Sequence, residues 1–427
     1  MDKLLSIGSE KSRLVKISKL IGTFVLGQGS LQLIQIVTGF MLFRWLSIEE
    51  YGQYSMAFAF QTMAHVLVEF GFSGTIVALV GNRIHDKRVI GGYIKAGESY
   101  RKKLFLVISI GCLFAFPMLT VKHHLSILTT AMLLVAIISN LYFSGWSSYY
   151  IPPLKMHQRI GKLFDIQIKS SAVRLLILYV TFLLSALNAW LAALLSSLQT
   201  FMAGYMIKKA SKEYIELPDS INKNDTKEML ALLKPVMPGI IFNAFQGQIM
   251  IFMMSVFGKT DNVAEIGALS KMGQLYMVLS MAGGMLIAPY IARSAFEGLL
   301  KKYLFISLSA LALCAMLVLS AYILPQPFLF LLGDKYSHLK NELIYLLIAS
   351  GIGVLTGIIW EMNESRKWIY SWDPVIMISG TIGVQLIAMF FFDLSSLRNV
   401  LLLTMATNLL VLSIKVASSI KGFSTGK

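Results

Sequence analysis

Long apolar stretches separated by short polar connections recur along the chain from residue 21 to residue 420. Because a helix needs about 20 mostly apolar residues to cross a bilayer, each stretch is long enough to be a membrane span. We expect spans near residues 21–43, 54–80, 104–121, 125–147, 163–184, 187–207, 229–257, 263–292, 303–323, 340–360, 373–392 and 395–414. The pattern predicts an all-α polytopic membrane protein with about 12 transmembrane helices, and its connections are too short to hold a soluble domain.

The distribution of positive charge sets the expected orientation. Hydrophobic residues make up 56% of the chain and charged residues only 14%. About 28 of the 38 Lys and Arg residues fall on every second connection and about 6 on the others, so both termini are expected to be cytoplasmic. The formal charge of +16 follows this topology instead of forming one basic face, which indicates the phospholipid membrane as the partner and no nucleic acid.

The sequence offers no support for catalytic, metal or nucleotide chemistry. The apolar run after the basic segment 1–20 is too long for a removable signal peptide, so we expect the first span to be retained. Cys112 and Cys314 lie inside apolar spans without a surrounding motif, which argues against a disulfide framework, a metal site or a redox cofactor. We interpret His123 and His124 as a solvated turn. A Gly-rich phosphate loop is missing, which argues against direct coupling to ATP.

A polar interval near the middle divides the chain. We expect a six-helix bundle over residues 1–208, a cytoplasmic linker over 209–228 and a second six-helix bundle over 229–427. Any repeat between the halves would be parallel, because six spans return the chain to the same side. Glu50-Tyr51-Gly52 and Glu265-Ile266-Gly267 are a short trace of such a repeat.

Helix-interrupting residues occur at matching places in the two halves. The first span contains Gly27 and Gly29, and the seventh opens with the segment Lys234-Pro235-Val236-Met237-Pro238-Gly239. Broken helices at corresponding positions indicate a transport pathway.

Amide side chains form stripes along the first two spans. Gln28, Gln32 and Gln35 recur at i, i+4 and i+7, which places them on one helical face that faces either a cavity or a packed neighbouring helix. Gln61, His65 and Glu69 form a similar stripe. We expect Glu69 near the cytoplasmic face, either as a functional carboxylate or as a cap for basic loops.

Similar polar residues enter the second half. Asn243 and Gln246 share a face of the seventh span, and Lys271 and Gln274 are spaced i, i+3 in the eighth. Lys271 is expected about 12 Å inside the outer end, where it either faces the lumen or snorkels to the headgroups.

The fifth span is the most charged. Asp165 and Lys169 at i, i+4 are expected to form an ion pair near the cytoplasmic entrance, although a solvated helix end gives the same pattern. Arg174 is expected near the bilayer centre, where a charged residue typically faces a bundle interior or a wet cavity. Arginine is suited to grip phosphate oxygens bidentately. Glu361 lies at the inner end of the tenth span and is either functional or simply the start of a cytoplasmic loop.

Two segments resemble a known family. Arg44-Trp45-Leu46-Ser47-Ile48-Glu49-Glu50-Tyr51-Gly52-Gln53-Tyr54 and Glu69-Phe70-Gly71-Phe72-Ser73-Gly74 are similar to the polysaccharide transporter family, the Wzx-type O-antigen flippases of the multidrug/oligosaccharidyl-lipid/polysaccharide exporter superfamily. Size, span number and basic inner loops agree along essentially the whole chain. One segment departs from the family: residues 146–156 replace the frequent aromatic-Phe-Gln-Gly-x-Glu run, which leaves the subfamily and its glycan open.

The resemblance implies two six-helix bundles that alternate between inward-open and outward-open states. The cargo would be an undecaprenyl-pyrophosphate-linked oligosaccharide, moved to the periplasmic leaflet of the bacterial inner membrane, in company with other polysaccharide-assembly membrane proteins. On this reading cations and amides bind the cargo, and carboxylates are candidates for coupling to a proton or sodium ion. The binding residues would be Arg174, Lys271, Gln28, Gln32, Gln35, Gln61, Asn243, Gln246 and Gln274, and the coupling residues Glu69, Asp165 and Glu361.

Two other functions compete with this reading. A cation-coupled multidrug exporter of the same superfamily would be expected to hold deep carboxylates, whereas the two deepest charges here are basic. A glycan polymerase or ligase typically works through a large external loop, whereas the longest outer connection here, near residues 324–339, is short. We therefore expect a transporter and not an enzyme.

Overall fold

The computed structural model describes residues 22, 26–81, 83–276, 279, 280, 283 and 287–425. The regular elements in this part of the chain are helices, which confirms the predicted all-α membrane fold. The polar segment 1–20 and the start of the first expected span lie outside the described residues. The described residues fall into two compact units: unit 1 lies within the ranges 1–41 and 57–247, and unit 2 within 42–56 and 248–427.

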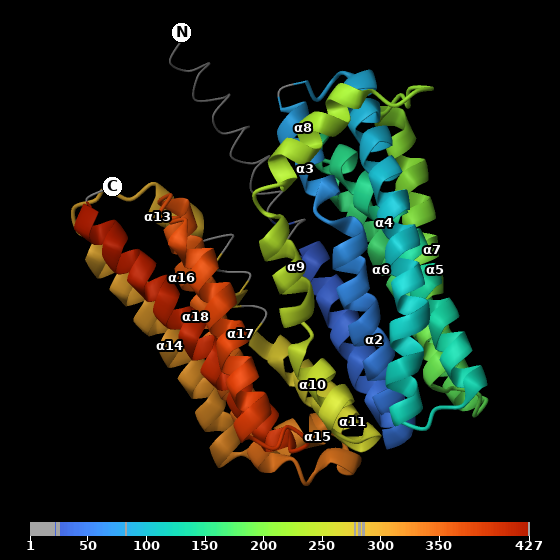
Figure 1. The fold of residues 1–427 in the computed structure, drawn as a ribbon, viewed down its shortest axis with the longest axis vertical. Coiled ribbons are helices and arrows are strands. Elements are labelled where there is room, and N and C mark those ends of the chain that lie inside the picture. Colours follow the sequence, from blue (N-terminus) through green and yellow to red (C-terminus); the bar gives the residue numbers. More distant parts are fainter. Residues whose placement is uncertain are drawn as a thin grey trace. The chain divides into compact units, whose positions relative to one another are not determined.

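Unit 1 is built mainly from long helices that run alongside one another (Figure 1). The first described helix, Leu26–Trp45, and α2 (Ile48–Glu69) pass from one unit to the other. The remaining elements are α3 (Phe72–Val80), α4 (Lys87–Lys122), α5 (Ile127–Met156), α6 (Ile160–Leu183), α7 (Ala189–Ser211), η1 (Lys212–Tyr214), α8 (Lys223–Leu233) and α9 (Met237–Gln246). Side-chain oxygens of Asp86, Ser126 and Asn188 cap the starts of α4, α5 and α7, which fixes where these helices begin.

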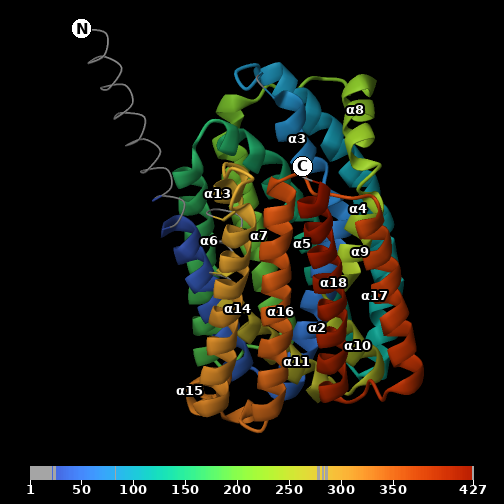
Figure 2. The same ribbon diagram turned by 90° about the vertical axis from the view of Figure 1, so that its left-hand side faces the viewer.

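Unit 2 packs α14, α16, α17 and α18 side by side (Figure 2). Its elements are α10 (Ile249–Phe257), α11 (Thr260–Met272), η2 (Gly273–Tyr276), α13 (Ala288–Ala292), α14 (Leu299–Ile323), α15 (Pro325–Leu332), η4 (Asp334–Tyr336), α16 (Lys340–Ser365), α17 (Trp372–Phe391) and α18 (Leu397–Thr425). The N-terminal part of α2 belongs to this unit, so a segment near the start of the chain completes a unit otherwise made by its second half.

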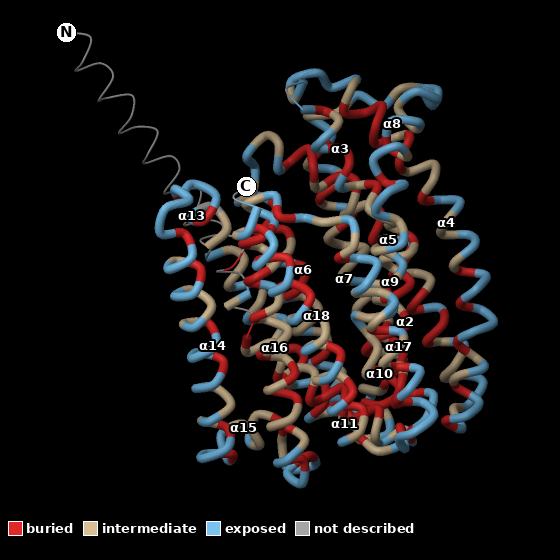
Figure 3. The backbone as a smooth tube through the Cα atoms, turned by 60° about the vertical axis from the view of Figure 1, so that its left-hand side comes forward, coloured by how far each residue is buried: buried red, intermediate tan, exposed pale blue. Residues whose placement is uncertain are grey.

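The outer faces of the long helices are apolar and exposed, as expected of lipid-facing surfaces. On α14, Leu304, Phe305 and Leu308 are exposed, and on α4 Leu106, Val107 and Phe114 are exposed. Figure 3 shows such exposed positions along both helices. The buried positions lie toward the neighbouring helices of each unit.

Ten described helices are long and apolar enough to span a membrane, or eleven if the bent pair α8–α9 counts as one span. Two of the predicted spans are not continuous helices in the described residues. The seventh span, expected over 229–257, is divided into α8, α9 and α10, and α8 and α9 meet at 63°. The eighth span, expected over 263–292, contains α11, which ends after 13 residues, and part of the remaining segment lies outside the described residues.

Two sequence signals predicted interrupted helices, the prolines near residue 235 and the glycines of the first span. Only the proline signal coincides with a break in a helix. The break between α8 and α9 falls at Lys234-Pro235-Val236, and Pro238 lies in the first turn of α9, where a missing N–H costs no hydrogen bond. The helix Leu26–Trp45, by contrast, continues through Gly27 and Gly29. A Cβ at Gly27 would overlap the ring of Phe164, so this glycine provides close packing and not a break.

The two short repeat traces pack against each other in unit 2. A Cβ at Gly52 would lie 2.5 Å from the carbonyl oxygen of Thr260. A Cβ at Gly267 would lie 2.8 Å from the Cβ of Ser55 and 3.4 Å from Cε1 of Tyr51. Both glycines therefore let α2 and α11 approach closely, the role that small residues typically have between membrane helices. The division into bundles at 209–228 stays a prediction; the compact units divide instead at Gly247 and within α2.

Candidate functional site

Arg174 lies within unit 1, far from both ends of its helix. It is roughly 21 Å along α6, which is about 36 Å long at 1.5 Å per residue. Its side chain is half-buried, and Nη1 donates a hydrogen bond to Oε1 of Gln199 at 3.2 Å. Nε2 of Gln199 in turn donates to Oγ of Ser171 at 2.7 Å. Sequence reasoning placed Arg174 but missed Gln199 and Ser171, which orient its guanidinium.

A second arginine, Arg101, forms a buried ion pair that the sequence did not reveal. Its Nε lies 3.9 Å from Oε2 of Glu69, and the two side chains are 8% and 14% exposed. Arg101 also donates to the carbonyl oxygen of Leu141, and its Nη2 lies 3.2 Å from Oγ of Ser144. Glu69 is thus held inside unit 1, and it also accepts a hydrogen bond from the backbone N–H of Ser73.

Arg101 was counted among the basic residues at the cytoplasmic end of its span. A signal for its burial was present, because Ile90, Ile94, Gly97 and Arg101 follow the 4-3-4 spacing of one helical face and all four are buried. A cation continuing an apolar face is a better candidate for a buried pair than one on the polar face.

Two residues with positive φ interrupt the helix at the segment that carried the family resemblance. Phe70 and Gly71 both have positive φ, 48° and 79°, and they separate α2 from α3. A Cβ at Gly71 would lie 3.2 Å from Leu233 and 3.3 Å from Ile240, on either side of the α8–α9 break. The segment Glu69-Phe70-Gly71-Phe72 therefore places Glu69 at the end of α2 and packs this turn against the broken helix.

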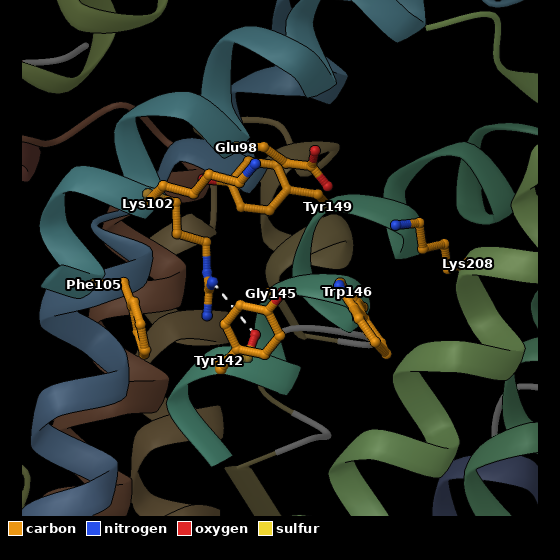
Figure 4. A pocket seen from close by; sticks show the side chains of 9 residues that line it. Glu98, Lys102, Phe105, Tyr142, Gly145, Trp146, Tyr149 and Lys208 are labelled. Atoms are coloured by element: carbon orange, nitrogen blue, oxygen red, sulfur yellow. Dashed lines mark hydrogen bonds between the residues drawn. The ribbon is translucent and has the colours of Figure 1, made fainter. Parts of the chain in front are cut away.

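A cavity of about 180 Å³ opens beside Arg101, between α4, α5 and α7. Three cations and four aromatic rings contribute most of its lining, as Figure 4 shows. The lining residues are Glu98, Arg101, Lys102, Phe105, Tyr142, Gly145, Trp146, Tyr149 and Lys208. Lys208 Nζ lies 5.3 Å from the ring centroids of both Trp146 and Tyr150, which is a cation–π distance.

Unit 2 contains a second buried ion pair. Nζ of Lys415 lies 2.5 Å from Oδ1 of Asp373, and the two side chains are 9% and 2% exposed. Ser418 donates to the other carboxylate oxygen at 2.9 Å, and the Lys415 ammonium lies 4.1 Å from the ring centroid of Trp360. The expected spans began at 373 and ended at 414, so both residues were taken for helix ends. Because α18 continues to Thr425, Lys415 lies well inside a helix.

The predicted amide positions differ in exposure. In the first helix Gln28 and Gln32 are half-buried and Gln35 is exposed, and in α2 Gln61 is half-buried. On α9 Asn243 is exposed and Gln246 half-buried. These six residues belong to unit 1, as Arg174 does.

The remaining predicted residues are placed as follows. Lys271 and Gln274 are half-buried in unit 2, where Lys271 lies in the last turn of α11 and Gln274 in η2. Nζ of Lys169 donates to Asp165 at 2.8 Å, which confirms the predicted ion pair, and both side chains are more than half exposed. Glu361 is half-buried on α16.

The two histidines of the expected solvated turn differ in exposure. His123 is only 5% exposed, so the expected solvated turn holds at most for His124. Within the described residues no group of three His, Cys, Asp or Glu side chains could hold a metal ion.

Solved structures of membrane transporters share this fold. The structure of a lipid II flippase, MurJ, in an inward closed conformation matches with a TM-score of 0.69 at 14% identity, covering 94% of this chain and 88% of that one. An inward-facing multidrug resistance MATE family transporter of the MOP superfamily matches at 0.65 and 14%, covering 92% and 94%. A MOP superfamily transporter from Pyrococcus furiosus matches at 0.52 and 15%, covering 96% of both chains. The chain thus has the fold of MOP superfamily transporters.

The family follows from the sequence. Residues 18–296, more than half of the chain, match the family described as Polysaccharide biosynthesis protein. The chain belongs to this family. No curated protein matches it closely enough to narrow the assignment.

Proposed function

We propose that this protein is a Wzx-type flippase that moves an undecaprenyl-pyrophosphate-linked oligosaccharide across the bacterial inner membrane by alternating access. Membership of the Polysaccharide biosynthesis protein family supports a lipid-linked glycan as the cargo. The fold supports alternating access, since its solved relatives include proteins described as a lipid II flippase and a multidrug resistance transporter.

The observation that carries the proposal is the oriented guanidinium of Arg174. It lies in the middle of a membrane helix, where a cation is costly and typically marks a functional position. Gln199 orients the guanidinium by accepting its hydrogen bond, and Ser171 holds Gln199 in place by accepting a hydrogen bond from its amide. Such a group can bind pyrophosphate oxygens through charge-assisted hydrogen bonds in a low-dielectric surrounding.

The other residues have supporting roles in this proposal. Lys271, a residue of unit 2, stays a candidate cation for the cargo. The half-buried amides Gln28, Gln32, Gln61, Gln246 and Gln274, together with the exposed Gln35 and Asn243, would bond sugar hydroxyls. The broken helix α8–α9 gives the type of discontinuity that transporters place beside their cargo.

Coupling to a proton or sodium ion would use a carboxylate. Glu69 is the best placed, because its exposure is low and its partner Arg101 can hold its charge in the absence of an ion. Asp165 is more than half exposed and Glu361 half-buried, which makes them weaker candidates.

Reconstitution in liposomes tests the proposal directly. We expect the purified protein to translocate a lipid-linked oligosaccharide and not to accumulate a cationic dye. Arg174→Gln should lower the flipping rate about ten- to a hundredfold, the value of one or two hydrogen bonds to a charged group. Arg174→Lys should retain part of the rate. Lys162→Gln, which removes a charge from an exposed position on α6, is the matched control and should flip normally.

Dye transport without lipid flipping would instead identify a multidrug exporter. Unchanged flipping by Arg174→Gln that inserts normally would remove Arg174 from the cargo site, and unchanged flipping by Lys271→Gln would do the same for Lys271.

A further inference from the structure

The cavity between α4, α5 and α7 contains none of the residues assigned to the cargo. We propose that it binds the phosphate of a membrane lipid headgroup with net negative charge, at the leaflet that the charge distribution predicts to be cytoplasmic. This inference does not rest on the proposed transport function, because it concerns binding alone.

The position of the cavity along α4 matches the level of lipid headgroups. α4 has 36 residues and is about 54 Å long, whereas the hydrocarbon core is about 30 Å thick. The segment 104–121 carries no charged residue and spans about 27 Å, so it accounts for the core. Arg101, Lys102 and Lys103 come directly before this segment, at the boundary between hydrocarbon and headgroups.

The surface next to the cavity fits an acyl chain. Lys102, Leu106 and Ile110 lie at i, i+4 and i+8, which places them on one face of α4. All three are exposed, and the two apolar side chains are 61% and 48% exposed. A lipid whose phosphate meets Lys102 would lay its chain along Leu106 and Ile110. A soluble anion would leave this apolar stripe unused.

The polar groups that reach the cavity suit a phosphate. Arg101, Lys102 and Lys208 contribute three cations, and they outnumber the carboxylates of Glu98 and Glu69, of which Glu69 pairs with Arg101. Figure 4 shows Lys102 beside the Tyr149 ring and Lys208 with Trp146 across the cavity, so the two ammonium groups approach it from opposite sides.

The hydroxyl of Tyr149 is an independent indication of a ligand. Tyr149 lines the cavity and its side chain is fully buried, yet within the described part of the structure its hydroxyl has no hydrogen-bond partner. A buried hydroxyl without a partner is unfavourable. A phosphate oxygen in the cavity would accept its hydrogen bond.

The volume of the cavity limits which part of a lipid can enter it. At about 180 Å³ it is smaller than the 300–1,000 Å³ typical of sites for whole small molecules. It can hold a headgroup phosphate but not an oligosaccharide. A phospholipid and a polyprenyl diphosphate both offer such a group, and the experiment distinguishes them.

Lipid titration of the full-length protein in detergent tests the site, with bound lipid counted by native mass spectrometry. The probes are phosphatidylglycerol, phosphatidylcholine, undecaprenyl diphosphate and inorganic pyrophosphate. The test variant is Lys102→Gln/Lys208→Gln. The control is Lys103→Gln/Lys209→Gln, which removes the same charge from neighbouring exposed positions that do not line the cavity.

We expect the test variant to bind phosphatidylglycerol or undecaprenyl diphosphate roughly 25-fold more weakly than wild type, at about fivefold for each cation removed. The control should keep wild-type affinity. Whichever of these two lipids binds more tightly is the source of the phosphate. Tyr149→Phe should unfold at the wild-type temperature without lipid but bind it about fivefold more weakly.

Three results would overturn the proposal. Equal losses in the test and control variants would mean a diffuse surface charge effect. Equal affinity for phosphatidylcholine would mean that net headgroup charge has no role. Binding of inorganic pyrophosphate as tight as that of either lipid would mean a site for a soluble anion.

Discussion

Nε of Arg101 lies 3.9 Å from Oε2 of Glu69, and both side chains are almost completely removed from solvent. Because each charge loses its hydration on burial, the pair is stable only while both members are present. Its hydrogen-bond partners Ser144, Leu141 and Ser73 come from two further segments of unit 1. The pair therefore joins α2, α4 and α5.

Breaking this pair on one side should destabilise the protein. Glu69→Gln leaves the Arg101 charge buried without a counter-charge, and we expect a loss of about 3 kcal/mol in the free energy of unfolding. The double variant Glu69→Gln/Arg101→Gln should lose less than the sum of the two single variants, by at least about 1 kcal/mol. Thermal unfolding in detergent measures the three variants. Strict additivity would show that the two side chains do not interact.

The exposed pair on α6 gives the contrasting case. Lys169 and Asp165 are closer, at 2.8 Å, but their side chains are 63% and 54% exposed. Solvent screens such a pair, so Asp165→Asn should change the free energy of unfolding by no more than about 0.5 kcal/mol. The same unfolding assay provides the comparison, and a loss as large as that of Glu69→Gln would contradict the role we give to burial.

The stability of unit 2 should depend on whether one or both members of its buried ion pair are replaced. Asp373→Asn leaves the Lys415 ammonium buried against Trp360, and we expect a loss of about 3–5 kcal/mol. Replacing both residues, as Asp373→Leu/Lys415→Met, should recover most of this loss because no charge remains to be desolvated. The unfolding midpoints of the two variants decide the matter. An unfolding midpoint of the double variant below that of Asp373→Asn would mean that the ion pair itself stabilises unit 2.

The turn after α2 should not tolerate a side chain at Gly71. Its φ of 79° is costly for an L-residue, and an added Cβ would press on Leu233 and Ile240. Gly71→Ala should therefore lose roughly 1–2 kcal/mol. Gly74→Ala is the matched control three residues away, where an added Cβ meets nothing within 4 Å and the backbone is helical. It should be neutral or slightly stabilising, and equal losses at both positions would refute the role of the positive φ.

Lys335 connects distant segments within unit 2. Its Nζ donates to the carbonyl oxygens of Arg44 at 3.0 Å and Leu46 at 2.6 Å, just where the helix Leu26–Trp45 ends. Arg44 in turn donates to the carbonyl oxygen of Phe330. Lysine at a helix C-terminus stabilises the orphan carbonyls, so Lys335→Met should lose about 1 kcal/mol in the free energy of unfolding.

This contribution should depend on pH. Burial lowers the pKa of Lys335 while the charge of Glu50 raises it, and burial has the larger effect. The folded protein therefore releases this proton before the unfolded chain, whose lysine pKa is about 10.4. The stability difference between wild type and Lys335→Met should increase as the pH rises through the window just below about 10.4. A difference that falls in this window would contradict the assigned direction.

Local sequence patterns predicted the spans and the proline break but not the pairings between distant helices. Hydrophobic periodicity depends on neighbouring residues, so the helices and the interruption at Pro235 could be predicted. Arg101 and Lys415 each lie next to an apolar stretch, where a charge is normally taken for a helix end. Their burial depends on Glu69 and Asp373, 32 and 42 positions away, which no local pattern specifies.

The candidate site shows the same division. Arg174 could be found because a cation within an apolar run is conspicuous in any sequence. Gln199 and Ser171 are ordinary polar residues until α6 and α7 bring them together. The cavity forms only where α4, α5 and α7 come together, and the burial of the Tyr149 hydroxyl depends on the same packing. The spacing of residues along the sequence predicts neither feature.

The composition of unit 2 has a consequence for synthesis of the chain. Residues 42–56 pack with residues from 248 onward, and nearly 200 residues of unit 1 separate them. At a translation rate of about 5–20 residues per second, this early segment waits roughly 10–40 s for its first partners. During that interval Gly52 lacks its packing contact with Thr260. The carbonyl groups at the end of the first helix also lack the hydrogen bonds from Lys335. A factor that shields nascent membrane helices would therefore be needed at this segment before any other part of unit 2 exists.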